Sequence, residues 1–304
     1  MRRPFRRLRA HSRRKWERSP TLSNGSARHQ SNCESIRLRF WVSRGEPAQA
    51  RLVLYNQTML RSISIPGLII TGTDTGVGKT LVAAGIGNWL RRLGFRVAVS
   101  KPVATGCPSR REGLVSEDAE ILAHFADARF PLDVICPQCY AEPLAPAVAA
   151  QRAGKPLDWE AIDRSIAQMT GQSDVIVVEG VGGLMVPMDE HSTFREVARH
   201  LGLPAVVVAR PGLGTINHTL LTLEALREAR IPIAGVVINR YPAENAGIAE
   251  ETNPRAIERW GKVPVLCLVP DEKVSGLDLP PGIVSAIDTV DWFQLASRGR
   301  SQSR

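Results

Sequence analysis

The chain has 304 residues, 43% of them hydrophobic, which is enough to bury the core of one large domain. Its formal net charge of +9 would suit a nucleic-acid-binding protein, but residues 1–58 alone hold 14 Lys and Arg against 3 Asp and Glu. These residues carry +11 and leave −2 for the remainder, so composition argues against nucleic acid as a partner of the globular part. Since no apolar run is long enough to cross a membrane, we expect no membrane partner either.

Residues 1–58 show no sustained apolar period, so we expect a disordered basic extension. They also lack the continuous apolar segment of a secretory signal. Three explanations stay open: a stretch upstream of a true translation start at Met59, an organelle transit peptide, or a functional basic arm. We expect residues 59–290 to form one α/β domain and residues 291–304 to form a C-terminal tail.

The five cysteines are an odd number scattered along the chain, which argues for a reducing, cytoplasmic location. Cys136 and Cys139 form a C-x-x-C pair, but a zinc site would need a second pair and a redox site would need a helix start after a strand. We therefore interpret this pair as loop packing.

The stretch Gly67–Thr80, GLIITGTDTGVGKT, predicts a buried strand over residues 68–71, a glycine-rich loop and a helix over residues 81–90. In this order, Gly76 and Gly78 let backbone N–H groups turn inward around phosphate oxygens. Lys79 is placed to reach the outer phosphates, and Thr80 is left to hold Mg²⁺. The motif is a variant, because its first glycine, Gly72, stands one position early.

Strands and helices alternate along the rest of the chain. Further strands are predicted over residues 95–100, 174–179, 204–209, 233–239 and 263–268, and helices over residues 144–153, 158–169, 217–230, 254–260 and 276–292. This alternation implies right-handed crossovers and a doubly wound, mostly parallel sheet with helices on both faces, as in P-loop NTPases.

Three charged residues occupy positions where ligands bind to such a sheet. Lys101 follows a strand directly and could meet an anion, or be a solvated lysine at a strand end. Glu179 ends the apolar strand over residues 174–179, as the acid of a Walker B element does. Asp118 lies in the first turn of a helix capped by Ser116, where it could bind magnesium or serve only the helix start.

Together these motifs resemble the dethiobiotin synthetase family over residues 67–271. The resemblance rests on six segments in the family's order: GTDTGVGKT (72–80), KPVATG (101–106), SEDA (116–119), VEGVGG (178–183), LGTINH (213–218) and VIN (237–239). It implies an ATP-dependent ligase of biotin biosynthesis, in which 7,8-diaminononanoate takes up CO₂ as a carbamate. The carbamate attacks the γ-phosphate of ATP, and the second amine then closes the ring.

The resemblance also implies roles for individual residues. Lys101 would bind the carbamate, Thr75 and Thr105 would contact the substrate nitrogens and carbamate, and Mg²⁺ would be held by Thr80, Asp118 and Glu179. The full set implied for ATP comprises Thr75, Gly76, Val77, Gly78, Lys79, Thr80, Leu81, Asp118, Glu179, Gly180, Val181, Gly182, Asn239, Arg240, Pro270, Asp271 and Glu272. Asn239 would read adenine, and the absence of an Asn-Lys-x-Asp guanine box favours ATP over GTP.

Two further features concern the substrate. The turn Leu213–His218 has free N–H groups suited to the substrate's distal carboxylate, and the resemblance implies that Asn217 serves the other subunit of a homodimer. Alternatively, Asn217 caps its own helix. Some family members carry glutamate where this chain has Gly76, so an acid cannot be assumed at that point.

Two rival hypotheses come from other classes. A P-loop switch ATPase of the partition or septum-site type shares the expected sheet, but proteins of that type resemble one another in having a lysine early in the loop, where this chain has Asp74. An amidotransferase-type ligase would need an added glutaminase domain, and too little chain follows the last predicted strand to hold one.

Overall fold

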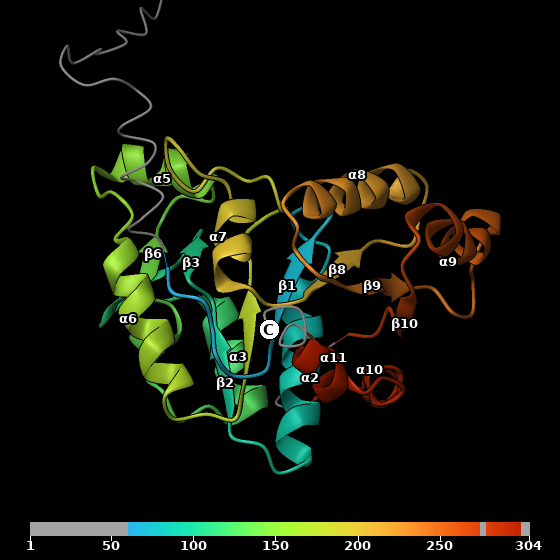
Figure 1. Ribbon diagram of the computed structural model, residues 1–304, viewed down its shortest axis with the longest axis horizontal. Coiled ribbons are helices and arrows are strands. Elements are labelled where there is room, and N and C mark those ends of the chain that lie inside the picture. Colours follow the sequence, from blue (N-terminus) through green and yellow to red (C-terminus); the bar gives the residue numbers. More distant parts are fainter. Residues whose placement is uncertain (1–59, 274–277, 299–304) are drawn as a thin grey trace, which may run out of the picture. The chain divides into compact units, whose positions relative to one another are not determined.

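The computed structural model describes residues 60–273 and 278–298, so the predicted extension over residues 1–58 and the end of the predicted tail lie outside the described residues. A sheet of six parallel strands forms the centre, in the order β10-β9-β8-β1-β7-β2 (Figure 1). Its strands are β1 (Gly67–Gly72), β2 (Val97–Ser100), β7 (Val175–Glu179), β8 (Ala205–Ala209), β9 (Ile233–Tyr241) and β10 (Val265–Pro270). The predicted doubly wound parallel sheet is confirmed.

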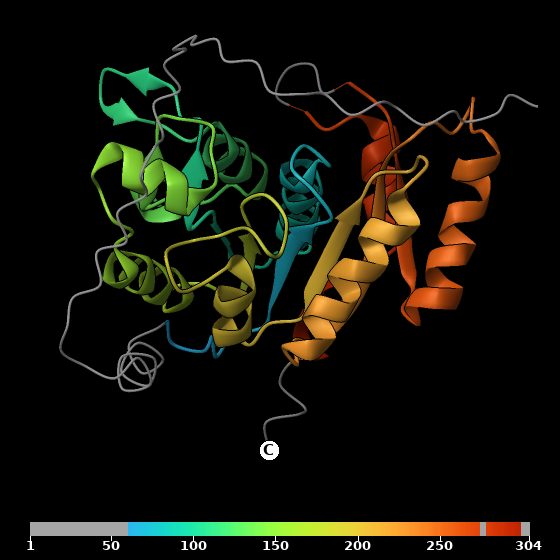
Figure 2. The same cartoon turned by 90° about the horizontal axis from the view of Figure 1, so that it is seen from above.

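Helices cover both faces of this sheet. They are α2 (Lys79–Arg92), α3 (Glu117–Ala126), α4 (Leu132–Ile135), α5 (Pro146–Ala153), α6 (Trp159–Thr170), α7 (Phe194–Leu201), α8 (Thr215–Glu228), α9 (Ile248–Gly261), α10 (Pro281–Asp288) and α11 (Trp292–Ser297). Helices α8 and α9 lie on one face and α2 and α10 on the other, as Figures 1 and 2 show. Strands β1, β7 and β8 are consequently buried along their whole length, as their continuous apolar runs require.

Two small sheets, which the sequence did not predict, flank the β2 side. Strand β3 (Val103–Thr105) pairs in parallel with β6 (Gln138–Tyr140), and β4 (Ser109–Arg110) pairs with β5 (Gly113–Leu114) in a short hairpin. Within β3 and β6, each strand has only three residues, too few to show a period. The described residues include no helix long and apolar enough to cross a membrane.

The C-terminal part differs from the prediction. The single helix predicted over residues 276–292 is wrong, because α10 ends at Asp288 and a separate helix α11 starts at Trp292. Asp291 makes this break by capping α11, its Oδ1 accepting a hydrogen bond from the Gln294 N–H at 2.9 Å. Trp292 is fully buried, so residues 292–297 belong to the packed domain and not to the tail predicted from residue 291.

Two further helices differ from the sequence prediction. Helix α9 begins at Ile248 and carries Pro254 inside it, whereas we predicted a start at the proline. Helix α7 was missed, although its buried residues Phe194, Val197, Ala198 and Leu201 follow the helical spacing i, i+3, i+4 and i+7. Its capping box could have found it: the Glu196 carboxylate accepts hydrogen bonds from both the N–H and the hydroxyl of Thr193.

Candidate active site

Residues 73–78, between β1 and α2, have the backbone shape of a phosphate-binding loop. Gly76 and Gly78 adopt φ values of 72° and 90°, which residues with a Cβ rarely adopt. A Cβ at Gly78 would also lie 1.9 Å from Nδ2 of Asn239, so this position has no room for a side chain. Because Gly78 caps α2 without a side chain, the first N–H groups of the helix stay available for an anion.

The early position of Gly72 has a packing reason. A Cβ there would lie 2.8 Å from Cγ2 of Val77, across the turn of the loop. Thr73, which stands where the usual motif has glycine, instead extends the parallel pairing, its N–H donating to the Val208 carbonyl at 3.0 Å. The loop therefore packs tightly even though its first glycine stands one position early.

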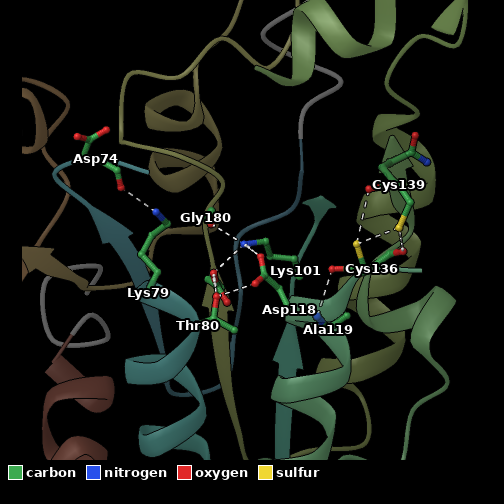
Figure 3. A network of polar contacts seen from close by, with 12 residues as sticks. Asp74, Lys79, Thr80, Lys101, Asp118, Ala119, Cys136, Cys139 and Gly180 are labelled. Carbon is green, nitrogen blue, oxygen red and sulfur yellow. Dashed lines mark hydrogen bonds and ion pairs between the residues drawn. The ribbon is translucent and has the colours of Figure 1, made fainter. Parts of the chain in front are cut away.

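Lys79 is the first residue of α2 and is almost fully buried. Its Nζ donates to the backbone carbonyl of Asp74 at 3.0 Å, so the side chain folds back over the loop (Figure 3). Burial, followed by the nearby ammonium of Lys101, lowers the pKa of Lys79 to about 8. An anion in the loop would offset this desolvation.

Lys101, Asp118 and Thr80 meet beside the loop (Figure 3), and Glu179 contacts both Lys101 and Thr80 there. The Nζ of Lys101 lies 2.7 Å from Asp118 Oδ2 and 2.7 Å from Glu179 Oε1, and donates to the Gly180 carbonyl at 3.1 Å. The Thr80 hydroxyl lies 2.8 Å from Asp118 Oδ1 and 2.9 Å from Glu179 Oε1. Four segments far apart in the sequence thus converge on one cluster.

The strand register explains this convergence. Ser100 of β2 is aligned with Val178 of β7, so the next residues, Lys101 and Glu179, leave the sheet at the same edge. Burial works against the charge of Lys101, but the two carboxylates outweigh it and raise the pKa of this lysine. The lysine is therefore held as a cation, and in turn it lowers the pKa of Asp118 against the effect of burial. Lys101 is therefore not a solvated lysine at a strand end, and both it and Asp118 face the loop.

The cluster also fits magnesium. Thr80, Asp118 and Glu179 offer only hard oxygen donors, and Oε2 of Glu179 is buried with no hydrogen-bond partner within the described part of the chain. Two carboxylates and a hydroxyl suit Mg²⁺, which takes one or two carboxylates and completes its shell with water and phosphate oxygens.

An open cavity of about 1160 Å³ lies over the loop and the cluster. The predicted residues that line it are Thr75, Gly76, Gly78, Lys79, Thr80, Leu81, Lys101, Thr105, Asp118, Glu179, Val181, Gly182, Arg240, Pro270, Asp271 and Glu272. Four other predicted residues, Val77, Gly180, Asn217 and Asn239, are not part of its lining.

One wall of the cavity was missed by the sequence analysis. It consists of Glu120, Ile121, His124 and Phe125 of α3, and Lys273 contributes at the other side. Once Asp118 is placed in the site, helical spacing sets Ile121 and Phe125 three and seven residues further along the same face. That period is the signal that could have identified them.

Asn239 lies beneath the phosphate loop. Its side chain is 1% exposed, and its Nδ2 donates to the carbonyl of Val77 at 2.9 Å. Its Oδ1 has no hydrogen-bond partner among the residues that the structure describes. An unpaired buried acceptor costs free energy, so this oxygen is suited to receive an N–H group from a ligand.

Asn217 lies elsewhere, on the exposed surface of α8. The cap of this helix is Gly214, with no side-chain cap bond, so the alternative that Asn217 caps α8 is wrong. The adjoining Leu213 is 93% exposed, an unusual environment for a leucine.

The cysteine pair is packed in the small β3–β6 sheet. The sulfurs of Cys136 and Cys139 lie 3.6 Å apart (Figure 3), and the Cys107 thiol is hydrogen-bonded to Cys139. Hydrogen bonding to Cys139, followed by burial, raises the pKa of Cys107. Because thiols with raised pKa values are poor nucleophiles, these contacts fit the packing interpretation.

Comparison with known proteins identifies relatives over the same part of the chain. The family described as AAA domain matches residues 66–276. An ATP-dependent dethiobiotin synthetase BioD of Thermodesulfovibrio yellowstonii is 42% identical, covering 67% of this chain and 88% of the relative. Those of Anaeromyxobacter dehalogenans and Bacillus velezensis are 42% and 34% identical, covering 64% and 76% of this chain and 90% and 98% of the relative.

A solved structure of the other candidate class is also similar. The MinC:MinD cell division protein complex of Aquifex aeolicus is 16% identical with a TM-score of 0.44, covering 79% of this chain and 97% of that chain. At this sequence identity and TM-score, the similarity supports no inference about function. The relatives at 34–42% identity do bear on family membership, and they agree with the site geometry. The chain therefore belongs to the ATP-dependent dethiobiotin synthetase family, with the P-loop NTPase fold.

Proposed function

We propose that the reaction of this family takes place in this chain where the phosphate loop meets Lys101. As a family member, the protein is an ATP-dependent ligase of biotin biosynthesis that carboxylates 7,8-diaminononanoate and closes the ring of dethiobiotin. The observation that carries the residue assignment is the contact of buried Lys101 with buried Glu179 and with the partly exposed Asp118, directly beside Thr80 of the phosphate loop.

In this proposal ATP lies along the cavity. Its phosphates take the N–H groups of the loop and the ammonium of Lys79, whose hydrogen-bond acceptor within the described residues is the backbone carbonyl of Asp74. Asn239 lies outside the cavity lining but next to Arg240, which does line it, so we propose that the adenine base reaches the unpaired Oδ1 of Asn239 from there. This oxygen would accept the amino group of adenine, a group that guanine lacks at that position. Arg240 and the segment Pro270–Glu272 line the same side and face the nucleoside.

Thr80, Asp118 and Glu179 would hold Mg²⁺. When bound, the ion neutralises the negative charge that spreads over the transferring phosphoryl group. Binding it requires Lys101 to release at least part of its contact with the two carboxylates. The ammonium is then free to bind a second anion, which supports its assignment to the substrate carbamate.

Lys101 stabilises charge in this scheme. Its ammonium is preorganised by the Gly180 carbonyl and buried from water, so it acts on the carbamate in a medium of low dielectric constant. Thr75 and Thr105 border the same end of the cavity, where their hydroxyls orient the substrate nitrogens and carbamate. No protein nucleophile is required, and catalysis rests on positioning.

Gly76 itself supplies no acid, and the carboxylate of nearby Asp74 is paired with Arg210. A Cβ at Gly76 would have no atom within 4 Å, so the space that a glutamate occupies in other family members is open here. We propose that substrate amines lose their protons to solvent or phosphate in this protein, without a carboxylate at position 76.

The second substrate contact comes from another copy of the chain. Asn217 is exposed and does not line the cavity, so it can reach substrate only across an interface. Leu213 beside it is 93% exposed, as expected of a residue that a partner covers. We therefore propose a homodimer in which this turn binds the distal carboxylate in the other subunit, and a cytoplasmic location where the small-molecule substrates are available.

A substrate-dependence assay tests the proposed function. Purified protein should release phosphate from ATP only when diaminononanoate and bicarbonate are both present, because the carbamate is the acceptor of the phosphoryl group. Steady ATP hydrolysis without the diamine would instead support the switch ATPase.

A further inference from the structure

Asp74 places a carboxylate within the phosphate loop itself. One of its oxygens accepts a hydrogen bond from the Thr75 N–H at 2.7 Å, and the other pairs with the guanidinium of Arg210. Its backbone carbonyl holds the ammonium of Lys79, whereas the carboxylate points away from that lysine (Figure 3). A fixed negative charge so close to an ATP site needs an explanation, because like charges repel.

Arg210 reaches Asp74 from a neighbouring strand. It is the first residue after β8, and β8 pairs with β1 in a register that aligns Val208 with Gly72. Both side chains of the ion pair are about half exposed, at 46% and 50%. A pair this exposed contributes little to folding stability, so its effect on the loop is the more important one.

We propose that Arg210 is a positioning residue for ATP. Its guanidinium neutralises Asp74 and keeps the carboxylate turned outward, so that it can bond the Thr75 N–H without facing the phosphates. Without Arg210, the carboxylate would be an unpaired anion beside the phosphates, and ATP would bind more weakly. This inference rests on the proposed placement of the ATP phosphates in the loop.

Substitution of Arg210 tests this role. We expect Arg210→Ala to raise the KM for ATP about tenfold with little change in kcat, because a tenfold change corresponds to about 1.4 kcal/mol of added repulsion in bound ATP. Arg210→Lys should recover part of the affinity, since it keeps the charge without the planar fork. The matched control is Arg96→Ala, which breaks a similarly exposed pair at the opposite edge of the sheet and should leave the KM unchanged.

The second substitution separates charge from structure. In the double variant Arg210→Ala with Asp74→Asn, the repelling charge is gone while the side-chain oxygen that caps Thr75 remains, so the KM for ATP should return toward the wild-type value. A merely structural role for Arg210 predicts no such recovery. A KM for Arg210→Ala within about twofold of wild type, or a double variant no better than the single one, would overturn the inference.

Lys79→Ala separates the role proposed for Arg210 from the proposed placement of the ATP phosphates in the loop. If Lys79→Ala loses nucleotide binding while Arg210→Ala binds ATP normally, the phosphate site stands and the role of Arg210 falls. If Lys79→Ala binds ATP as wild type does, the phosphates are not in the loop and both ideas are wrong. Binding is measured directly by calorimetric titration with ADP and with a non-hydrolysable ATP analogue.

Discussion

Strands β2 and β7 lie side by side and carry an oppositely charged pair at each end. At the amino ends Arg96 pairs with Asp174 at 2.6 Å, and at the carboxyl ends Lys101 pairs with Glu179 at 2.7 Å. The side chains of the first pair are 61% and 37% exposed, and those of the second are 4% and 1% exposed. Similar charges at similar distances therefore stand in opposite environments.

This difference separates structure from function. Water screens the exposed pair, which joins the amino ends of the two strands but contributes little to the free energy of unfolding. Burying the second pair costs desolvation free energy that hydrophobic residues would avoid, so its presence points to a task that needs charge. In parallel α/β folds, ligands bind at the carboxyl ends of the strands, which is where this buried pair lies.

Substituting one carboxylate from each pair should give the largest contrast. We expect Glu179→Gln to reduce turnover at least about 100-fold, because it removes a magnesium ligand and the strongest partner of Lys101. It should also lower the free energy of unfolding by about 3 kcal/mol, since a buried ammonium loses a partner. Asp174→Asn is the control and should change turnover little. Turnover assays and urea unfolding measure both effects, and turnover of Glu179→Gln within about tenfold of wild type would contradict the assignment.

Two glycines with the same φ of 90° allow a similar comparison, because Gly94 lies before β2, at the amino ends of the strands, and Gly78 lies after β1, at their carboxyl ends. Gly94 lies in the turn between α2 and β2, and a Cβ there would have no atom within 4 Å. We expect Gly94→Ala to cost about 1 kcal/mol of stability from backbone strain alone. Gly78→Ala adds a clash with Asn239, so it should cost more and also abolish ATP binding. Thermal unfolding and calorimetric titration would show whether the two variants instead behave alike.

Mixed dimers test whether the active site at the carboxyl ends of the strands includes Asn217 of a partner subunit. Lys101→Ala and Asn217→Trp subunits should each be inactive alone. If Asn217 acts across the interface, every mixed dimer has one intact site, and random mixing should restore roughly a quarter of wild-type activity. With subunit exchange verified by mass spectrometry, an inactive mixture would mean that both residues serve the same subunit's site.

The smallest effect is expected for the Arg96–Asp174 pair at the amino ends of β2 and β7, where stability should change slightly at acid pH. Hydrogen bonds from the Arg96 side chain and N–H lower the pKa of Asp174 from 3.8 to about 2. A carboxyl group with a depressed pKa stabilises the folded state above its ordinary value, and this contribution is lost as the pH falls through about 2. Wild type should therefore unfold at a slightly higher temperature than Asp174→Asn near neutral pH, and the difference should vanish in acid. A difference that grows as the pH falls would reverse the sign of this argument.

The sequence predicted what depends on local order. The strand, loop and helix of residues 67–90 are consecutive, so their spacing alone indicated a phosphate loop, and Lys101 and Glu179 were placed at strand ends by the same reasoning. Their contact was not predictable from residues alone, because it depends on β2 pairing with β7, which are separated by more than 70 residues.

The remaining misses have different reasons. Strands β3 and β6 have three residues each, which is too short for a period to appear. Helix α7 does carry a helical period, which we overlooked. The α3 wall of the cavity became evident only when Asp118 was seen to face the loop. The Asp74–Arg210 pair joins two loops whose proximity comes from the β1–β8 register, so no spacing in the sequence indicates it.

The central claim is that Lys101 acts on the reacting group and not on the nucleotide. Turnover and the affinity for a non-hydrolysable ATP analogue should be measured on the same preparation of Lys101→Gln, with Arg96→Gln as the control at the other end of β2. We expect turnover of Lys101→Gln to fall by a factor that corresponds to about 3 kcal/mol, while its nucleotide affinity stays near that of wild type. Near-normal turnover, or a loss of nucleotide affinity as large as the loss of turnover, would contradict the claim.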